Sequence, residues 1–274
     1  MRTSILYTIA GLLAAATALP TAPTASSTAQ PNLSAIKSVK NSTFHTYKQG
    51  GLVRAPLISG GLKTRSSLAA RTSCATSSQF TWGDNDHGGP GLVITNGGNA
   101  WDGYYMYENS CDSVPFKYFW LAPGSTQFIS LPAGFQGRVS RGTDAMNLAG
   151  QPQLLGTWLE LSFDPYNVNE LWGDISLIRG CDGGMLMWAL DGSGSWKGFT
   201  QDVLANAPVG AWAEKPDGTW VLAPGEGPTT DAETTQYLLG AVGADNAFLN
   251  DAYGDPVISS QNRRYGVWMD GGRI

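Results

Sequence analysis

Gly156-Thr-Trp-Leu-Glu-Leu-Ser-Phe-Asp and Trp172-Gly-Asp-Ile-Ser-Leu-Ile-Arg-Gly-Cys-Asp-Gly-Gly-Met-Leu-Met-Trp188 are two runs separated by a short polar link. In the first run, three apolar residues alternate with three residues of other kinds. The apolar set is Leu159, Leu161 and Phe163, and the other set is Trp158, Glu160 and Ser162. Because successive side chains of a strand point to opposite faces, this alternation predicts a strand with one face turned toward a core.

The second run repeats the pattern and places a second acid. Ile175 and Leu177 alternate with Asp174 and Ser176. Glu160 and Asp174 therefore fall on the face of each strand that lies away from the core. If the two strands are neighbours, both carboxylates share one surface. The alternative is two solvated acids on an exposed sheet face, which is where most such residues are found.

Around these runs, residues 73–274 consist of short β-rich stretches separated by glycine and other turn residues. This pattern predicts an all-β fold, an antiparallel β-sandwich with long loops. Thr235–Val242 and Lys197–Ala205 are the two stretches expected to form short helices. About 200 residues are enough for a single substantial core. The expected strands are Gln79–Trp82, Gly91–Thr95, Gly103–Tyr107, Lys117–Leu121, Gln127–Leu131, Gly137–Arg141, Trp158–Phe163, Asp174–Ile178, Met185–Ala189, Gly210–Glu214, Thr219–Leu222 and Tyr265–Met269.

The N-terminal part of the chain is of a different kind. Residues 1–18 have one basic residue, an apolar run and a small-x-small sequence at their end, and these features predict a secretory signal peptide. The apolar run is too short for a membrane span. Residues 19–72 are rich in Ser, Thr, Ala and Pro, and we interpret them as a disordered leader or a propeptide. The sequence thus predicts a secreted protein without a membrane span.

Charge divides the chain in the same place. Residues 1–72 contain eight of the 17 basic residues and no acid, so residues 73–274 hold the other nine with all 22 acids. The domain therefore has a formal net charge of 9 − 22 = −13. This charge argues against nucleic acid as a ligand, because phosphate binding needs positive charge. It is compatible with neutral glycans or cationic partners.

The chain has three cysteines, Cys74, Cys111 and Cys181. In an oxidising compartment we expect one disulfide and one free thiol, and the sequence leaves all three pairings open. A metal site is not expected, since Cys-x-x-Cys is absent from the sequence and the two histidines are far apart. We predict no cofactor.

Several stretches, taken in order, resemble the motifs of thaumatin-like proteins. Gly137-Arg-Val-Ser-Arg-Gly-Thr resembles "G-R-I-W-A-R-T", Trp158-Leu-Glu-Leu-Ser-Phe resembles "L-A-E-F-T-L", and Gly173-Asp-Ile-Ser-Leu-Ile-Arg-Gly resembles "Y-D-V-S-L-V-D-G". Asp245-Asn-Ala-Phe-Leu-Asn-Asp-Ala-Tyr-Gly-Asp-Pro is similar to "D-A-Y-S-Y-A-Y-D-D-P". The shared order covers about 180 residues. The chain departs from the family in its few cysteines, so apolar burial must supply stability. We identify the sequence as a divergent, fungal-type thaumatin-like protein.

The resemblance implies an acidic cleft. Carried over by position, its carboxylates fall on Glu160 and Asp174. Its arginine falls on Arg141 if one residue is deleted and on Arg138 if none is. A further acid falls on Arg179, which reverses the charge, and nearby Asp182 is the candidate to compensate. Trp158 and Trp172 share the strand face of the two acids and could stack on sugar rings.

Some members of the family bind or slowly hydrolyse β-1,3-glucan, and the resemblance implies the same for this chain. Hydrolysis would make it a glycoside hydrolase with Glu160 as acid and Asp174 as second carboxylate. Because the acid set is incomplete, we favour binding of cell-wall glucan, by a monomer, over turnover. The alternative is a secreted interaction protein, an effector or antigen, that keeps the fold without carbohydrate chemistry.

Overall fold

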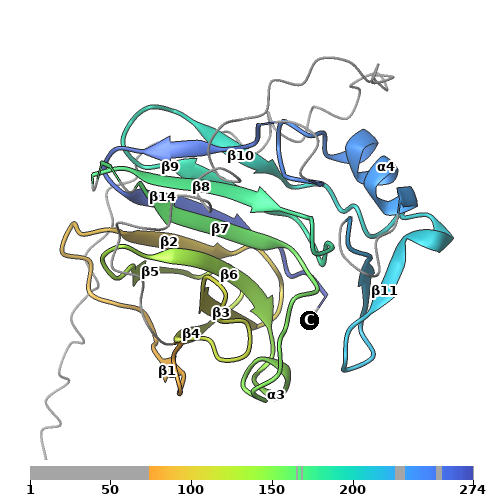
Figure 1. The fold of residues 1–274 in the computed structure, drawn as a ribbon, viewed down its shortest axis with the longest axis horizontal. Helices are drawn as coiled ribbons and strands as arrows, with labels where there is room; N and C mark the ends of the chain where they lie inside the picture. The colour runs from red at the N-terminus through yellow and green to blue at the C-terminus, as the bar shows by residue number, and fades with distance from the viewer. Residues whose placement is uncertain (1–73, 165, 168, 226–231, 251–254, 274) are drawn as a thin grey trace, which may run out of the picture.

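Two β-sheets pack face to face in the computed structural model of this chain (Figure 1). The structure describes residues 74–164, 166, 167, 169–225, 232–250 and 255–273. The predicted signal peptide, 1–18, and the leader, 19–72, lie outside the described residues. The larger sheet has the order β1 (Gln79–Phe80), β4 (Lys117–Leu121), β3 (Asp102–Glu108), β6 (Gln136–Gly142), β7 (Trp158–Phe163), β8 (Leu171–Ser176) and β13 (Ile258–Ser260).

The second sheet has five strands, and a separate hairpin lies beside the sandwich. The order of the five is β10 (Trp196–Phe199), β9 (Met185–Ala189), β14 (Arg264–Met269), β2 (Gly91–Asn96) and β5 (Thr126–Ser130). The hairpin is β11 (Trp212–Glu214) with β12 (Trp220–Leu222). The helical segments are α3 (Asp144–Asn147), the 3-10 turn η1 (Val209–Ala211) and α4 (Ala232–Ala241), which lies near the hairpin in Figure 1.

The predicted all-β class is confirmed. Most neighbouring strands are antiparallel, as expected, but β1 pairs with β4 and β14 pairs with β2 in parallel. In the second of these pairs, the last strand enters the sheet beside a strand from the start of the domain. The core between the sheets is aliphatic and aromatic. It includes Leu92, Ile94, Tyr104, Met106, Phe119, Val139, Leu159, Leu161, Ile175, Met187 and Val267.

The two predicted helices have different outcomes. The stretch Lys197–Ala205 is not a helix, because Trp196–Phe199 forms β10 on the edge of the second sheet. Gly198 has a φ of +115°, and a Cβ there would lie 2.2 Å from the carbonyl oxygen of Met185. Only glycine fits so close to β9. The helix expected at Thr235–Val242 does form, as α4, three residues earlier at its start.

The structure selects one of the three cysteine pairings. Cys74 and Cys111 form the disulfide, with their Cα atoms 5.4 Å apart, and Cys181 is a buried free thiol. Disulfides persist in oxidising compartments, so this bond is consistent with the predicted secretion. In the part of the chain that the structure describes, no helix is long and apolar enough to cross a membrane.

Candidate functional site

One row of side chains crosses the larger sheet on the face turned away from the core. The register of the strands places Tyr107 opposite Arg138, Arg138 opposite Glu160, and Glu160 opposite Asp174. We call Arg138, Glu160 and Asp174 the carboxylate row. Directly opposite residues of antiparallel strands have Cβ atoms roughly 5 Å apart, so the two acids are immediate neighbours. The expectation that Glu160 and Asp174 share a face is thus met by the strand register.

The two acids of the carboxylate row have different surroundings. Glu160 is half-buried, whereas Asp174 is 2% exposed. The Oδ1 atom of Asp174 has no hydrogen-bond partner among the described residues. Burial, and then the negative charge of Glu160, raise the pKa of Asp174 well above its ordinary value. The surroundings of Asp174 therefore favour its protonated form, and the acid role predicted for Glu160 stays a prediction.

Arg138 is held from three sides. Its guanidinium lies over the rings of Tyr107 and Trp158, at 4.4 and 4.1 Å from the ring centroids. Its Nη1 donates to Oδ1 of Asp112 at 2.5 Å. A planar guanidinium stacks on aromatic faces in this way at little cost in hydration. Of the two arginines considered from the sequence, Arg138 is the one beside Glu160.

The two tryptophans of this face are also fixed in place. The indole N–H of Trp158 donates to the carbonyl oxygen of Leu154 at 2.9 Å. That of Trp172 donates to Oδ2 of Asp164 at 3.1 Å. Both indoles are partly exposed, and they come from the strands that carry the two acids. The row thus has an aromatic side chain on either side along the strands.

The raised pKa of Asp174 leads to a prediction about pH. A carboxyl whose folded-state pKa is raised stabilises the fold below its ordinary pKa of 3.8, and this contribution is lost as pH rises through the folded-state value. We expect the free energy of unfolding of Asp174→Asn, relative to that of the unchanged chain, to increase as pH rises from about 4 toward 8. Urea unfolding at a series of pH values measures the difference, and Asp217→Asn, on the exposed β11–β12 turn, is the control. A difference that stays constant with pH would contradict the assignment.

Arg141 and Asp182 are not part of the carboxylate row. Arg141 lies on the core-facing side of β6, opposite Tyr104 of β3. Its Nη2 donates to Oδ1 of Asp182 at 2.6 Å, and Lys215 Nζ donates to the other carboxylate oxygen at 3.0 Å. Burial alone would raise the pKa of Asp182, but the charges of Arg141 and Lys215 hold it at about 2. This buried charge cluster joins β6 to the hairpin and to the C-terminal segment, because Lys215 also donates to the carbonyl oxygen of Arg273.

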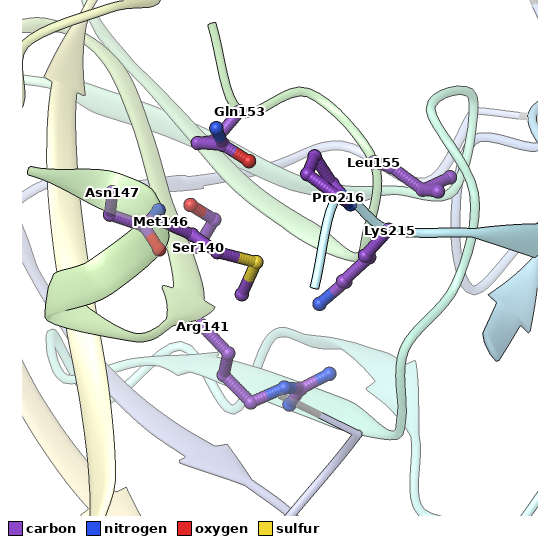
Figure 2. Close-up of a pocket in the computed structure, with 8 residues that line it drawn as sticks. All are labelled: Ser140, Arg141, Met146, Asn147, Gln153, Leu155, Lys215 and Pro216. Atoms are coloured by element: carbon purple, nitrogen blue, oxygen red, sulfur yellow. The ribbon is translucent and has the colours of Figure 1, made fainter. Parts of the chain in front are cut away.

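A small cavity beside this cluster is too small for a sugar. Figure 2 shows its walls, which come from β6, α3, the loop before β7 and the β11–β12 turn. Its polar side chains are Ser140, Arg141, Asn147, Gln153 and Lys215. Its volume of about 20 Å³ is close to the room needed by a single water molecule. Ligand binding is therefore better sought on the outer face than in this cavity.

Some residues at the site were not singled out from the sequence. Asp112 and Tyr107 hold Arg138, and Asn147 donates from its amide to the hydroxyl oxygen of Tyr107 at 2.9 Å. Tyr107 carried a usable signal, since its strand alternates between core-facing and outward residues. Asp112 lies in a loop and Asn147 ends the short helix α3, and nothing in their local sequence indicates which strand they meet.

No protein-family model and no curated protein matches this sequence. Solved structures do match the fold. One is the structure of the thaumatin-like xylanase inhibitor TLXI, at 12% identity over 66% of this chain and 98% of that chain, with a TM-score of 0.36. Another is the crystal structure of the protein elicitor MoHrip2 from Magnaporthe oryzae, at 15% identity over 52% of this chain and 94% of that one, with a TM-score of 0.31.

The described residues form a two-sheet β-sandwich. The resemblance to thaumatin-like proteins drawn from the motifs agrees with the first of these matches, a thaumatin-like xylanase inhibitor. At these identities and TM-scores, what either matched protein binds is not transferred to this chain. The site is therefore judged on its own strands and contacts.

Proposed function

We propose that this protein is a secreted thaumatin-like protein that binds a neutral cell-wall glycan of the β-1,3-glucan type on the outer face of its larger sheet. The observation that carries the proposal is the register that aligns Arg138, Glu160 and Asp174 in one row. Trp158 and Trp172 flank the row, and their indoles are held by hydrogen bonds. Such a surface offers a hydrogen-bonding group beside flat apolar rings. A sugar carries matching groups, because its hydroxyls form hydrogen bonds and one face of its ring is apolar.

Charge favours an uncharged ligand. The domain from residue 73 onward has 22 acids against nine basic residues. An anionic polymer would be repelled by that excess. Arg138 is the cation of the row, and its charge is already matched by Asp112. Glu160, the partly exposed acid of the row, can instead exchange hydrogen bonds with sugar hydroxyls.

Binding fits the row better than hydrolysis does. Glycoside hydrolases place their two carboxyl groups on either side of the scissile bond, about 5–5.5 Å apart in retaining enzymes and about 6.5–9.5 Å in inverting ones. Both groups must reach the substrate. Asp174 is 2% exposed and has Glu160 as its direct cross-strand neighbour. Turnover would first need Asp174 to become accessible, with Asp174 as the proton donor.

The binding proposal is tested with the full secreted chain on insoluble β-1,3-glucan, chitin and cellulose. We expect retention on β-1,3-glucan without release of reducing sugar. Glu160→Gln should weaken binding about tenfold or more, because a hydrogen bond to a charged group contributes about 1.5–3 kcal/mol. Glu214→Gln is the matched control, since Glu214 is an exposed glutamate on a strand of the separate hairpin. Retention on none of the three polymers would sink the proposal.

The second candidate is a secreted interaction protein that keeps the fold without carbohydrate chemistry. The observation in its favour is the buried charge cluster, in which Arg141 pairs with Asp182 and is not available to a ligand. The names of the two matched structures, an inhibitor and an elicitor, fall in the wider class of interaction or defence proteins. This candidate becomes the better account if glycan binding fails in the test above.

A further inference from the structure

A cluster of aromatic side chains lies at the β1 edge of the larger sheet, as the described residues form it, away from the carboxylate row. The ring of Trp82 meets that of Phe80 at 4.7 Å and that of Trp101 at 6.4 Å, both edge to face. Phe80 meets Tyr118 of the next strand at 5.2 Å. We call Phe80, Trp82, Trp101 and Tyr118 the aromatic edge. Trp82 is 65% exposed, Trp101 54% and Phe80 38%, so large apolar rings face solvent together here.

The loop that carries Trp82 is held by a partly buried acid, Asp84. Oδ2 of Asp84 accepts from Lys117 Nζ at 2.7 Å and from the backbone N–H of Ser130 at 2.8 Å. It also accepts from the Ser130 hydroxyl. These contacts tie the residues after β1 to β4 and β5. Trp82 therefore stands on a fixed support although its own ring is exposed.

The loop that carries Trp101 is held by a buried amide. Nδ2 of Asn96, a fully buried residue, donates to the carbonyl oxygens of Ala100 at 2.8 Å and Leu121 at 3.0 Å. Its Oδ1 accepts from the N–H of Gly98 at 2.8 Å. Two separate loops are thus fixed so that their indoles meet at the surface. Rings fixed in advance lose little conformational entropy when a ligand covers them.

The chemistry of the aromatic edge fits an uncharged polymer of sugar units. The nearby cation, Lys117, is paired with Asp84 and is largely buried. The excess of acids in the domain disfavours anionic ligands. A neutral polar side chain lies near the rings, since the amide of Gln127 packs against Gly83, the residue after Trp82. Flat apolar faces with a neutral polar border match the two sides of a pyranose ring.

The aromatic edge belongs to the same sheet as the carboxylate row. Tyr118 stacks on Tyr105 at 5.6 Å, with the rings 2° from parallel, and Tyr105 shares its face with Trp158 through the register of β3, β6 and β7. Four strand spacings separate β1 from β7, which is about 19 Å at the usual 4.8 Å per spacing. A glycan chain of several units is long enough to touch both places, and a disaccharide is not.

We propose that the aromatic edge is a second contact site for the glycan polymer. With both sites occupied, the protein binds long glycan chains more tightly than short fragments. This inference rests on the proposed function for the identity of the ligand. It assigns Trp82 and Trp101 as the binding residues of the edge.

The test compares a soluble β-1,3-glucan polymer with its disaccharide, using the full secreted chain. We expect the double variant Trp82→Ala/Trp101→Ala to bind the polymer at least about tenfold more weakly and the disaccharide unchanged. Trp220→Ala is the matched control, because Trp220 is 51% exposed on the separate hairpin. In the unchanged chain, the polymer should also protect tryptophan fluorescence from acrylamide quenching, a readout that needs no variant.

The outcomes separate the two proposals. If Glu160→Gln weakens both ligands while the double variant weakens only the polymer, both proposals stand. If Glu160→Gln changes nothing and the double variant still weakens the polymer, the carboxylate row fails and the aromatic edge stands. Polymer binding by the double variant equal to that of the unchanged chain overturns the inference. So does sedimentation that shows a dimer which the double variant dissociates, because the occupant of the edge would then be a second copy.

Discussion

Asp182→Ala is expected to destabilise the domain by about 3–5 kcal/mol, because it leaves Lys215 buried without its carboxylate partner and leaves Arg141 with the longer 3.5 Å contact to Asp270 as its remaining ion pair. The side chains of Arg141, Asp182 and Lys215 are all at most 5% exposed. Removing one partner of a buried pair costs the solvation of the charge left behind, whereas the intact pair contributes little. The cluster also anchors the C-terminal segment, since Nζ of Lys215 donates to the carbonyl oxygen of Arg273 at 3.0 Å. The variant should therefore loosen both β6 and that segment.

Urea unfolding of Asp182→Ala and the unchanged chain measures this loss. Asp86→Ala is the control, because Asp86 pairs with Arg264 at the surface, where such pairs contribute about 0–1 kcal/mol. The pH dependence gives a second check. The pKa of Asp182 is lowered to about 2, so its contribution is complete above the ordinary value of 3.8 and is lost as pH falls toward 2. Equal losses for Asp182→Ala and Asp86→Ala would show that the cluster does not support the fold.

Leu159→Ala is expected to cost about 2–5 kcal/mol, the range for truncation of a fully buried leucine. Leu159 is 0% exposed and lies in the middle of the larger sheet, between Val139 of β6 and Ile175 of β8. Neither neighbouring strand can move inward freely, because each is hydrogen-bonded on both sides. The cavity left by the missing side chain should therefore stay largely open.

The same substitution at Leu148 provides the control for this prediction. Leu148 ends α3 and is 37% exposed, so Leu148→Ala should change the free energy of unfolding by about 0.5 kcal/mol or less. Chemical unfolding of both variants gives the comparison. A small loss at Leu159 would mean that the apolar side of the stretch Trp158–Phe163 does not face the core.

The alternation of residues in that stretch was enough to predict which side of the strand is buried. Leu159, Leu161 and Phe163 are buried, and Trp158, Glu160 and Ser162 are partly exposed. The same parity placed Glu160 and Asp174 on one face. A strand has a period of two, and this local rule does not depend on what the strand packs against. The all-β class followed for the same reason, from many short alternating runs divided by turns.

Parity also explains why the arginine was left open. Arg138 and Arg141 are three residues apart, so they point to opposite faces of β6. An uncertainty of one residue in matching a motif exchanges one for the other. The structure places Arg138 beside Glu160 and Arg141 in the buried charge cluster with Asp182. Sequence matching could name both candidates, and only the register of β6 against β7 could choose.

The sequence by itself determined the local properties of this protein: the strands, their buried faces and the pair of acids on one face. Tertiary structure alone decided what depends on contacts between distant segments. These are the Cys74–Cys111 disulfide, the partners of Arg138 and Arg141, the parallel pairing of β14 with β2, and the meeting of Trp82 with Trp101. The physical reason is that alternation is set by the backbone of each strand, whereas ion pairs, disulfides and ring contacts depend on how loops bring the ends of different strands together.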